Sequence, residues 1–147
     1  MTQVYIAGAL SGPADNTALK AFYEELAKVV RKCGAEPYLP HQHTDPHEHP
    51  DVDPRDVYNR NKAKIEESAL VLAYAGEASS GLGVELEIAN GRLIPVVLLV
   101  EKGKSVSRML FGHPAVREIV VSFLSIDTAL DDPLFVDALE ATIASWI

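Results

Sequence analysis

The chain has 147 residues, of which 48% are hydrophobic, and its formal net charge at pH 7 is -8. This length and apolar content suit one domain with its own core, so we expect a single domain over residues 1–147. The negative charge disfavours a nucleic-acid polymer or an anionic membrane as the main partner, because either would repel the protein.

Cysteine usage and hydropathy predict a location. The one cysteine, Cys33, allows no internal disulfide, which favours a reducing compartment. No signal peptide precedes the first apolar run, and no apolar run is long enough to span a membrane. We therefore expect a cytoplasmic protein.

Strand-forming and helix-forming segments alternate from the start of the chain. Residues 4–7 are a short β-prone run, and residues 16–31 show the spacing of a helix with one buried stripe. Gly34 is expected to close that helix. Residues 35–39 form a weaker strand, and Pro37 within it suggests an edge position.

Residues 41–54 break this alternation. They contain His41, His43, His47 and His49, several acids and no hydrophobic periodicity, which predicts a mobile loop, with Asp53-Pro54 starting the next helix. Histidines and acids together could bind a metal ion, but transition-metal sites usually place their ligands on rigid elements. We favour a flexible lid over a ligand and expect neither a metal nor a cofactor.

The second half of the chain returns to alternating elements. We expect a helix at 55–67, a strand at 69–74, a helix from Leu86 to Gly91, a strand at 95–100, a strand within 116–123 and a helix at 134–147. The apolar face of the first of these helices should comprise Val57, Tyr58, Ala63 and Ile65. This order predicts an α/β fold with a doubly wound, flavodoxin- or Rossmann-like, five-stranded parallel sheet.

Two turn-rich segments follow predicted strands. One is residues 9–13, and the other is residues 79–85, where Ser79, Gly81 and Gly83 precede Glu85. Such loops lie at the carboxyl ends of parallel strands, where free backbone N–H groups and a helix N-terminus favour an anion. Gly81 and Gly83 would let the backbone approach a ligand closely. The alternative is a plain helix-capping loop with a surface glutamate, since neither a dinucleotide fingerprint nor a Walker loop is present.

Three motifs in register carry a family resemblance. They are Tyr5-Ile6-Ala7-Gly8, Ser79-x-Gly81-x-Gly83-x-Glu85, and Ser107-x-Met109 followed by Gly112. Together they resemble the nucleoside 2-deoxyribosyltransferase-like superfamily, and within it the 2'-deoxynucleoside 5'-phosphate N-hydrolases. The resemblance runs in order over most of the chain.

The resemblance implies roles for particular residues. Glu85 would match the essential glutamate that attacks or stabilises the anomeric carbon of the sugar, and Tyr5 the tyrosine that positions it. Gly8 would let the ligand approach the end of the first strand. The positions around the 5'-phosphate would be Ser79, Gly81 and Ser107. In the family the last of these reaches into the site of a neighbouring subunit, which implies a homodimer.

The chain also departs from the family pattern. Asn61 stands where the family usually carries an aspartate, and an asparagine cannot protonate a leaving base. His41 or His43 could supply that proton instead. Ser11 stands where the hydrolases can show an arginine, which weakens the expected hold on a phosphate.

The resemblance implies an enzyme that hydrolyses the N-glycosidic bond of (deoxy)nucleoside 5'-monophosphates. Breaking that bond builds positive charge on the sugar and negative charge on the base, so a buried carboxylate and a nearby donor are the minimum equipment. Two alternatives stay open: base exchange by a deoxyribosyltransferase using the same Glu85, and a nucleotide-binding module with little catalysis. The base and the 2' substituent of the sugar also stay open.

Overall fold

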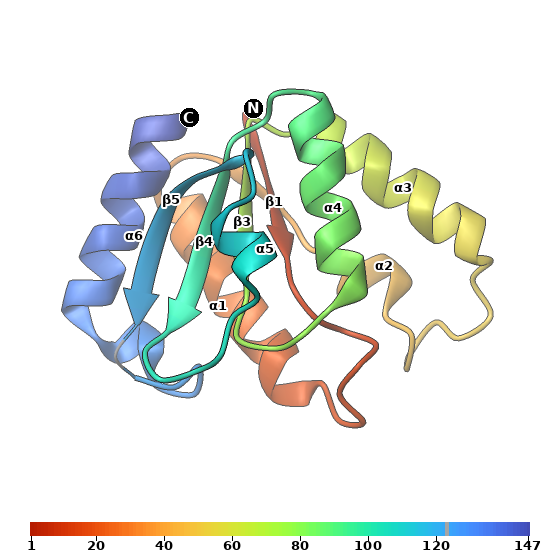
Figure 1. Cartoon of the computed structure of the whole chain (residues 1–147), viewed down its shortest axis with the longest axis horizontal. Helices are drawn as coiled ribbons and strands as arrows, with labels where there is room; N and C mark the ends of the chain where they lie inside the picture. The colour runs from red at the N-terminus through yellow and green to blue at the C-terminus, as the bar shows by residue number, and fades with distance from the viewer. Residues whose placement is uncertain (123) are drawn as a thin grey trace.

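The computed structural model describes residues 1–122 and 124–147, and these residues build one parallel sheet with helices on both faces (Figure 1). The strands are β1 (Gln3–Ala7), β2 (Glu36–Tyr38), β3 (Leu70–Tyr74), β4 (Val96–Glu101) and β5 (Val116–Ser122). The helices are α1 (Thr17–Lys32), α2 (His41–Thr44), α3 (Pro54–Glu66), α4 (Ser80–Gly91), α5 (Arg108–Phe111) and α6 (Pro133–Trp146), with a 3₁₀ turn at Ala129–Asp131.

The strand order is β2-β1-β3-β4-β5, and every pair in it is parallel. The predicted doubly wound five-stranded sheet is therefore confirmed, and β2 lies at an edge, as Pro37 suggested. The chain runs from β1 outward to β2 and then returns to β3 on the other side, so its direction of winding reverses between β1 and β3. Ligands of such sheets bind at this reversal, beyond the carboxyl ends of the strands. Phe123, expected in the fifth strand, lies outside the described residues.

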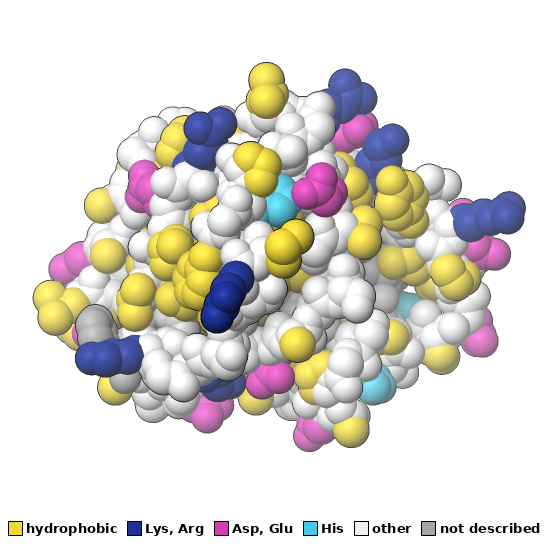
Figure 2. Space-filling model, in the orientation of Figure 1, with side chains coloured by type: hydrophobic (Ala, Val, Ile, Leu, Met, Phe, Trp, Pro, Cys, Tyr) yellow, Lys and Arg dark blue, Asp and Glu magenta, His cyan; other side chains and the backbone are white. Residues whose placement is uncertain are grey.

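The two faces of the sheet are covered unequally. Helices α3, α4 and α5 lie on one face, but α5 is a single turn with no buried residue. Side chains of β5 that point to this face therefore stay exposed, Ile119 by 43% and Val121 by 41%. Figure 2 shows hydrophobic side chains gathered over β4 and β5 beside α5.

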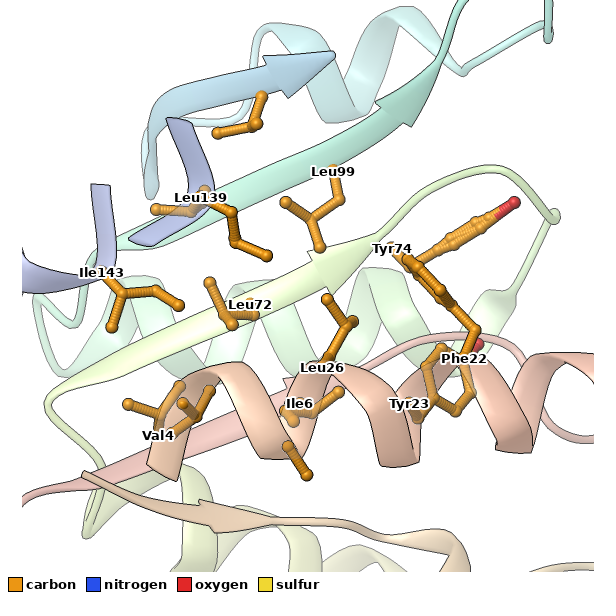
Figure 3. Packing of buried hydrophobic residues seen from close by; sticks show 14 of the residues in the cluster. Val4, Ile6, Phe22, Tyr23, Leu26, Leu72, Tyr74, Leu99, Leu139 and Ile143 are labelled. Carbon is orange, nitrogen blue, oxygen red and sulfur yellow. The ribbon is translucent and has the colours of Figure 1, made fainter. Parts of the chain in front are cut away.

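The other face carries the larger core. Helices α1 and α6 bury Leu26, Leu139 and Ile143 against side chains of β1, β3 and β4, among them Ile6 and Leu72 (Figure 3). The spacing of these residues on their helices produces the buried stripes expected from the sequence. Within the described residues, no helix combines the length and the apolar character needed to cross a membrane.

Helix α3 differs from its expected packing. Only Ile65 of the predicted apolar face is fully buried, while Tyr58 is 47% exposed and Ala63 is exposed. Asp53 caps the helix by accepting a hydrogen bond from the Arg55 N–H, so its predicted start at Asp53-Pro54 is confirmed. The reason for the exposure is position: α3 lies beside α4 and extends past the sheet, so only its last turn reaches the core (Figure 1).

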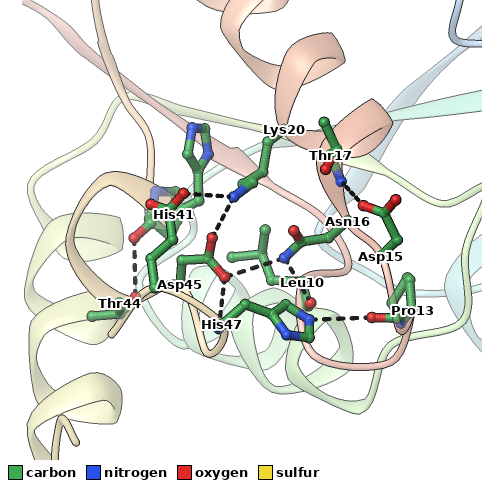
Figure 4. Close-up of polar contacts among 12 residues, drawn as sticks. Leu10, Pro13, Asp15, Asn16, Thr17, Lys20, His41, Thr44, Asp45 and His47 are labelled. Carbon is green, nitrogen blue, oxygen red and sulfur yellow. Dashed lines mark hydrogen bonds and ion pairs between the residues drawn. The ribbon is translucent and has the colours of Figure 1, made fainter. Parts of the chain in front are cut away.

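Residues 41–54 are more ordered than the predicted mobile loop. Residues 41–44 form α2, where His41 and Thr44 are buried, and Asp45 is fully buried directly after it. Figure 4 shows that Asp45 accepts hydrogen bonds from the Asn16 side chain, the Lys20 ammonium and the His47 N–H, at 3.2, 2.7 and 3.0 Å. Hydrophobic periodicity could not reveal this segment, because its order depends on one buried charge.

The Asp45 anchor, meaning Asp45 with Asn16 and Lys20, joins two segments that lie far apart in the sequence. Asn16 also donates to the carbonyl of Leu10 at 3.1 Å, so the loop after β1 is tied to the segment after β2. Burial alone would raise the pKa of Asp45, but the hydrogen bonds from Lys20, His47 and Asn16 outweigh it and lower the pKa to about 2.

We expect Asp45→Asn to lower the free energy of unfolding at pH 7 by about 2 kcal/mol, since the ionised group is favoured in the folded state. A carboxylate whose folded pKa is depressed stabilises the fold above its unfolded pKa and loses that effect as pH falls through its folded pKa. The difference in unfolding free energy between variant and native protein should therefore shrink from pH 4 towards pH 2. Urea denaturation at several pH values measures it.

Glu48→Gln is the matched control, because Glu48 also pairs with Lys20 but is exposed. An exposed ion pair contributes about 0 to 1 kcal/mol, so this variant should stay close to the native protein. Equal unfolding free energies of Asp45→Asn and native protein at pH 7 would contradict the anchor.

Candidate active site

A cavity of about 480 Å³ opens at the carboxyl ends of β1 and β3, where the winding of the sheet reverses. We call it the glutamate cavity. Its walls come from the loop after β1, the α2–α3 segment and the start of α4. The lining residues are Gly8, Leu10, Ser11, Gly12, Thr44, Pro46, Val57, Asn61, Ala78, Ser79, Ser80, Gly81, Leu82 and Glu85.

Glu85 is the one residue with an ionisable side chain among these described lining residues. It lies in the second turn of α4, and its Oε1 accepts a hydrogen bond from the Tyr5 hydroxyl at 2.9 Å. Burial raises the pKa of Glu85 to about 7, and the hydrogen bond from Tyr5 partly opposes that rise. Burial and the charge of Glu85 in turn hold the pKa of Tyr5 well above its usual value, so Tyr5 stays a donor at neutral pH.

Aromatic stacking holds Tyr5 in place. Tyr5 is fully buried on β1 and stacks on Tyr38 of β2, with ring centroids 5.5 Å apart. Tyr38 in turn stacks on His43. Tyr5 therefore orients Glu85 through its hydrogen bond and does not itself line the cavity.

Asn61 lies on the wall that α3 contributes. Its Oδ1 is buried and accepts no hydrogen bond from any described residue. A buried acceptor without a partner is costly, so a donor group on a ligand in the cavity would satisfy it. Asn61 can accept or donate a hydrogen bond, but it cannot supply a proton to a leaving group.

The start of α4 forms another wall of the cavity. We expected a glycine-rich loop here, but α4 already begins at Ser80, so Gly81 and Gly83 lie in its first turn. Ser79 caps the helix by accepting from the Leu82 N–H at 3.2 Å, and Leu82 is buried against the sheet, which together start the helix early. Amides of a first helical turn have no intrahelical partner, so this end of the cavity suits an anion.

The loop after β1 also lines the cavity. A Cβ at Gly8 would lie 2.2 Å from the hydroxyl oxygen of the buried Tyr23, so no larger residue fits there without moving that ring. Ser11 and Gly12 follow on the rim. None of the described lining residues is a lysine or an arginine, so an anion would be held by hydroxyls and backbone amides.

Four predicted site residues lie outside the cavity lining. Tyr5 supports Glu85, as described. Gly83 and Ser107 line a separate hollow of about 270 Å³ on the other side of residues 79–80, where Ser107 caps α5. His41 is buried, and its ring pairs with Glu24 at 2.7 Å. That contact directs the His41 ring towards α1, and His41 does not line the glutamate cavity.

Several lining residues were not predicted. Thr44, Pro46 and Val57 come from the segment that we expected to be a mobile lid, and the Asp45 anchor is what brings them to the wall. The available signal was Asp45 itself, an acid between Thr44 and Pro46, which pairs with the partly buried Lys20 on α1. As for metals, no group of three or more His, Cys, Asp or Glu suited to hold an ion occurs in the part of the chain that is described.

The chain was compared with known families and curated proteins. The family model described as nucleoside 2-deoxyribosyltransferase matches residues 4–131. A protein of Syntrophotalea carbinolica, provisionally named 2'-deoxynucleoside 5'-phosphate N-hydrolase 1, is 34% identical over 71 residues. That alignment covers 47% of this chain and 50% of the relative, so the chain matches about half the length of that relative.

Solved structures share the fold. A CMP N-glycosidase from Clostridium botulinum superimposes with a TM-score of 0.64 at 17% identity, covering 91% of this chain and 99% of that one. A 2-deoxyribosyltransferase from Bacillus psychrosaccharolyticus gives a TM-score of 0.62 at 17% identity, covering 92% and 96%. At this identity the likeness concerns the arrangement of helices and strands alone.

Proposed function

The chain belongs to the nucleoside 2-deoxyribosyltransferase family, and from this premise we propose that it hydrolyses the N-glycosidic bond of (deoxy)nucleoside 5'-monophosphates. The products would be the free base and (deoxy)ribose 5-phosphate. The observation that carries the proposal is the Glu85 carboxyl, held by Tyr5 in a cavity at the point where the sheet reverses its winding. The relative provisionally named as a nucleotide N-hydrolase supports it.

Glu85 would act on the anomeric carbon. Tyr5 occupies Oε1, which leaves the second carboxylate oxygen for the sugar. As the C1'–N bond breaks, positive charge grows on the sugar, and a desolvated carboxylate stabilises it more strongly than a solvated one. Glu85 would either form a bond to C1' or stabilise the cation, and water would complete the hydrolysis.

The first turn of α4 would receive the 5'-phosphate. Ser79, Ser80 and Gly81 present hydroxyls and backbone amides to the cavity, and the N-terminus of this 12-residue helix carries a partial positive charge. Ser11 faces them from the loop after β1. Asn61 would bind the sugar or the base through its unpartnered Oδ1.

One observation favours the second candidate, base exchange between free nucleosides. No lysine or arginine appears among the described residues that line the cavity, so the phosphate site is weaker than a phosphate-specific enzyme could have. A deoxyribosyltransferase would use the same Glu85 and would need no phosphate site. A third candidate, a nucleotide-binding module, rests on Asn61 at the place of an acid.

A substrate panel separates the three candidates. Purified protein is incubated with nucleosides and their 5'-monophosphates, each with and without a second free base, and the products are identified by chromatography. Free base from a monophosphate supports the hydrolase, and a new nucleoside formed only with the second base supports exchange. Binding without any product would leave the binding module.

We expect Glu85→Gln to abolish turnover, because it removes the charge and keeps the volume. Native turnover should rise with pH through about 7 as Glu85 ionises. The pKa of Glu85 is about 7 in the folded protein and 4.5 in the unfolded chain, so native stability should fall as pH rises from about 4.5 to about 7.

The glutamine variant should therefore be more stable than the native protein at pH 8, on the order of 2 kcal/mol, and similar to it at pH 4. Thermal unfolding measures this independently of activity. A glutamine variant with near-normal turnover would rule out the assignment of Glu85.

We also propose that the working form is a cytoplasmic homodimer in which Ser107 completes the partner's site. The exposed apolar side chains beside Ser107 support this, since Met109 is 81% and Phe111 46% exposed, and they adjoin the uncovered face of β5 (Figure 2). Ser107 itself lies outside the glutamate cavity of its own chain. A second copy would bury these side chains.

Light scattering should give about twice the chain mass of 16.0 kDa. Met109→Glu should yield a folded monomer, because it places a charge in the interface. Leu134→Glu is the matched control: Leu134 is 80% exposed at the start of α6, which covers the opposite face of the sheet.

The shared site has its own test. Glu85→Gln and Ser107→Ala, each of which should be inactive alone if Ser107 completes the partner's site, are mixed and allowed to exchange subunits. Each heterodimer then holds one intact site, so about a quarter of native activity should return in a symmetric dimer. A monomer with full activity, or a mixture without recovery, would contradict the proposal.

A further inference from the structure

The glutamate cavity continues into a second hollow, of about 290 Å³. Ser11, Thr44, Pro46 and Val57 line both spaces, so the two are contiguous. Beyond this shared wall the hollow is lined by His49, Pro50, Val52 and Pro54. We call it the proline hollow.

The proline hollow lies where a leaving base would extend, and this step rests on the proposed function. If the phosphate binds at the first turn of α4 and the sugar lies against Glu85, the base projects from C1' away from α4. The wall that both hollows share, which includes Pro46 and Val57, then faces the base. Apolar walls around a flat heterocycle, with few polar groups, are typical of a small-molecule subsite.

The ionisable residues in this combined space are few. Among the described residues that line the two hollows, only Glu85 and His49 carry ionisable side chains. They stand in different hollows, as the two charges of the reaction require: a carboxylate for the sugar, and a proton donor for the base.

Other contacts occupy the remaining histidines of residues 41–49. His41 pairs with Glu24, His43 stacks on Tyr38, and the His47 ring donates to the carbonyl of Pro13 at 3.3 Å. The ring of His49 makes no hydrogen bond or ion pair with any described residue and is exposed in the hollow. It is therefore available to a ligand.

The backbone of His49 is nevertheless fixed. Its N–H donates to the carbonyl of Asp45 at 2.7 Å, and its own carbonyl accepts from the Val52 N–H at 3.3 Å. Asp45 is buried and bound to Lys20. The Asp45 anchor thus fixes the backbone position from which the His49 side chain lines the hollow.

We propose that His49 is the proton donor to the leaving base. The electron pair of the C1'–N bond stays on the base nitrogen, the imidazolium of His49 gives its proton to the base, and an oxygen of Glu85 bonds to C1'. In the second step a water oxygen bonds to C1' as the bond to Glu85 breaks, and the proton lost by that water returns to His49. Both side chains end as they began.

The test uses two substrates with the same sugar phosphate. One is the nucleotide that the native protein cleaves, and the other carries 4-nitrophenol in place of the base, a leaving group that departs as an anion without a proton. His49→Gln should lower turnover of the nucleotide by roughly 100-fold or more and leave release of 4-nitrophenol near native. Imidazole added to His49→Ala should restore part of the nucleotide turnover.

His47→Gln is the matched control, because its ring lies in the same segment but binds Pro13 outside both hollows. It should behave as native towards both substrates. Equal losses on both substrates, or no loss on either, would overturn the assignment of His49 while leaving the hydrolase in place. If the native protein cleaves neither substrate, the proposed function itself fails, and this inference fails with it.

Discussion

Parallel pairing between β1 and β3 brings Tyr5 within hydrogen-bond reach of Glu85, 80 residues later in the chain. The pairing aligns Ala7 with Ala73, so both strands end at the same edge of the sheet and both following loops face one space. Tyr5 lies inside β1, and Glu85 lies on the helix that packs over it. The carboxyl group is thereby desolvated and still oriented by a buried donor, which is the combination that the proposed reaction, with its developing positive charge on the sugar, would require.

The buried charge of Asp45 is a second constraint, and it acts on one wall of the glutamate cavity. Asp45 is a fully buried charge, and a buried charge is tolerated only when it is paired and hydrogen-bonded. Satisfying it draws the segment after β2 onto α1 and onto the loop after β1, and this produces the wall that Thr44 and Pro46 form. A segment rich in histidine and proline thus acquires a defined position without a hydrophobic stripe of its own.

The electrostatics of the cavity bear on the proposed nucleotide substrate. The protein is acidic overall, and the described residues that line the cavity include one acid and no base. An anionic ligand would depend on the α4 N-terminus and on hydroxyl groups at one end, while Glu85 stands close by with its pKa raised to about 7. A partly neutral Glu85 would lessen the repulsion between carboxylate and phosphate during binding, and ionisation would then prepare it for the reaction.

The sequence by itself determined the alternation of strands and helices and the buried stripes of α1 and α6, and it singled out Glu85 as a candidate, because these depend on local periodicity and on a short motif. Only the tertiary structure decided that α4 begins at Ser80, that α3 leaves Tyr58 exposed, that His41 turns to Glu24, and that His49 lines the hollow next to the glutamate cavity. The physical reason is that each depends on a partner distant in the chain. Burial of Leu82 extends a helix, a missing sheet beneath α3 leaves its face in water, and the Lys20 charge on α1 sets the course of residues 45–49.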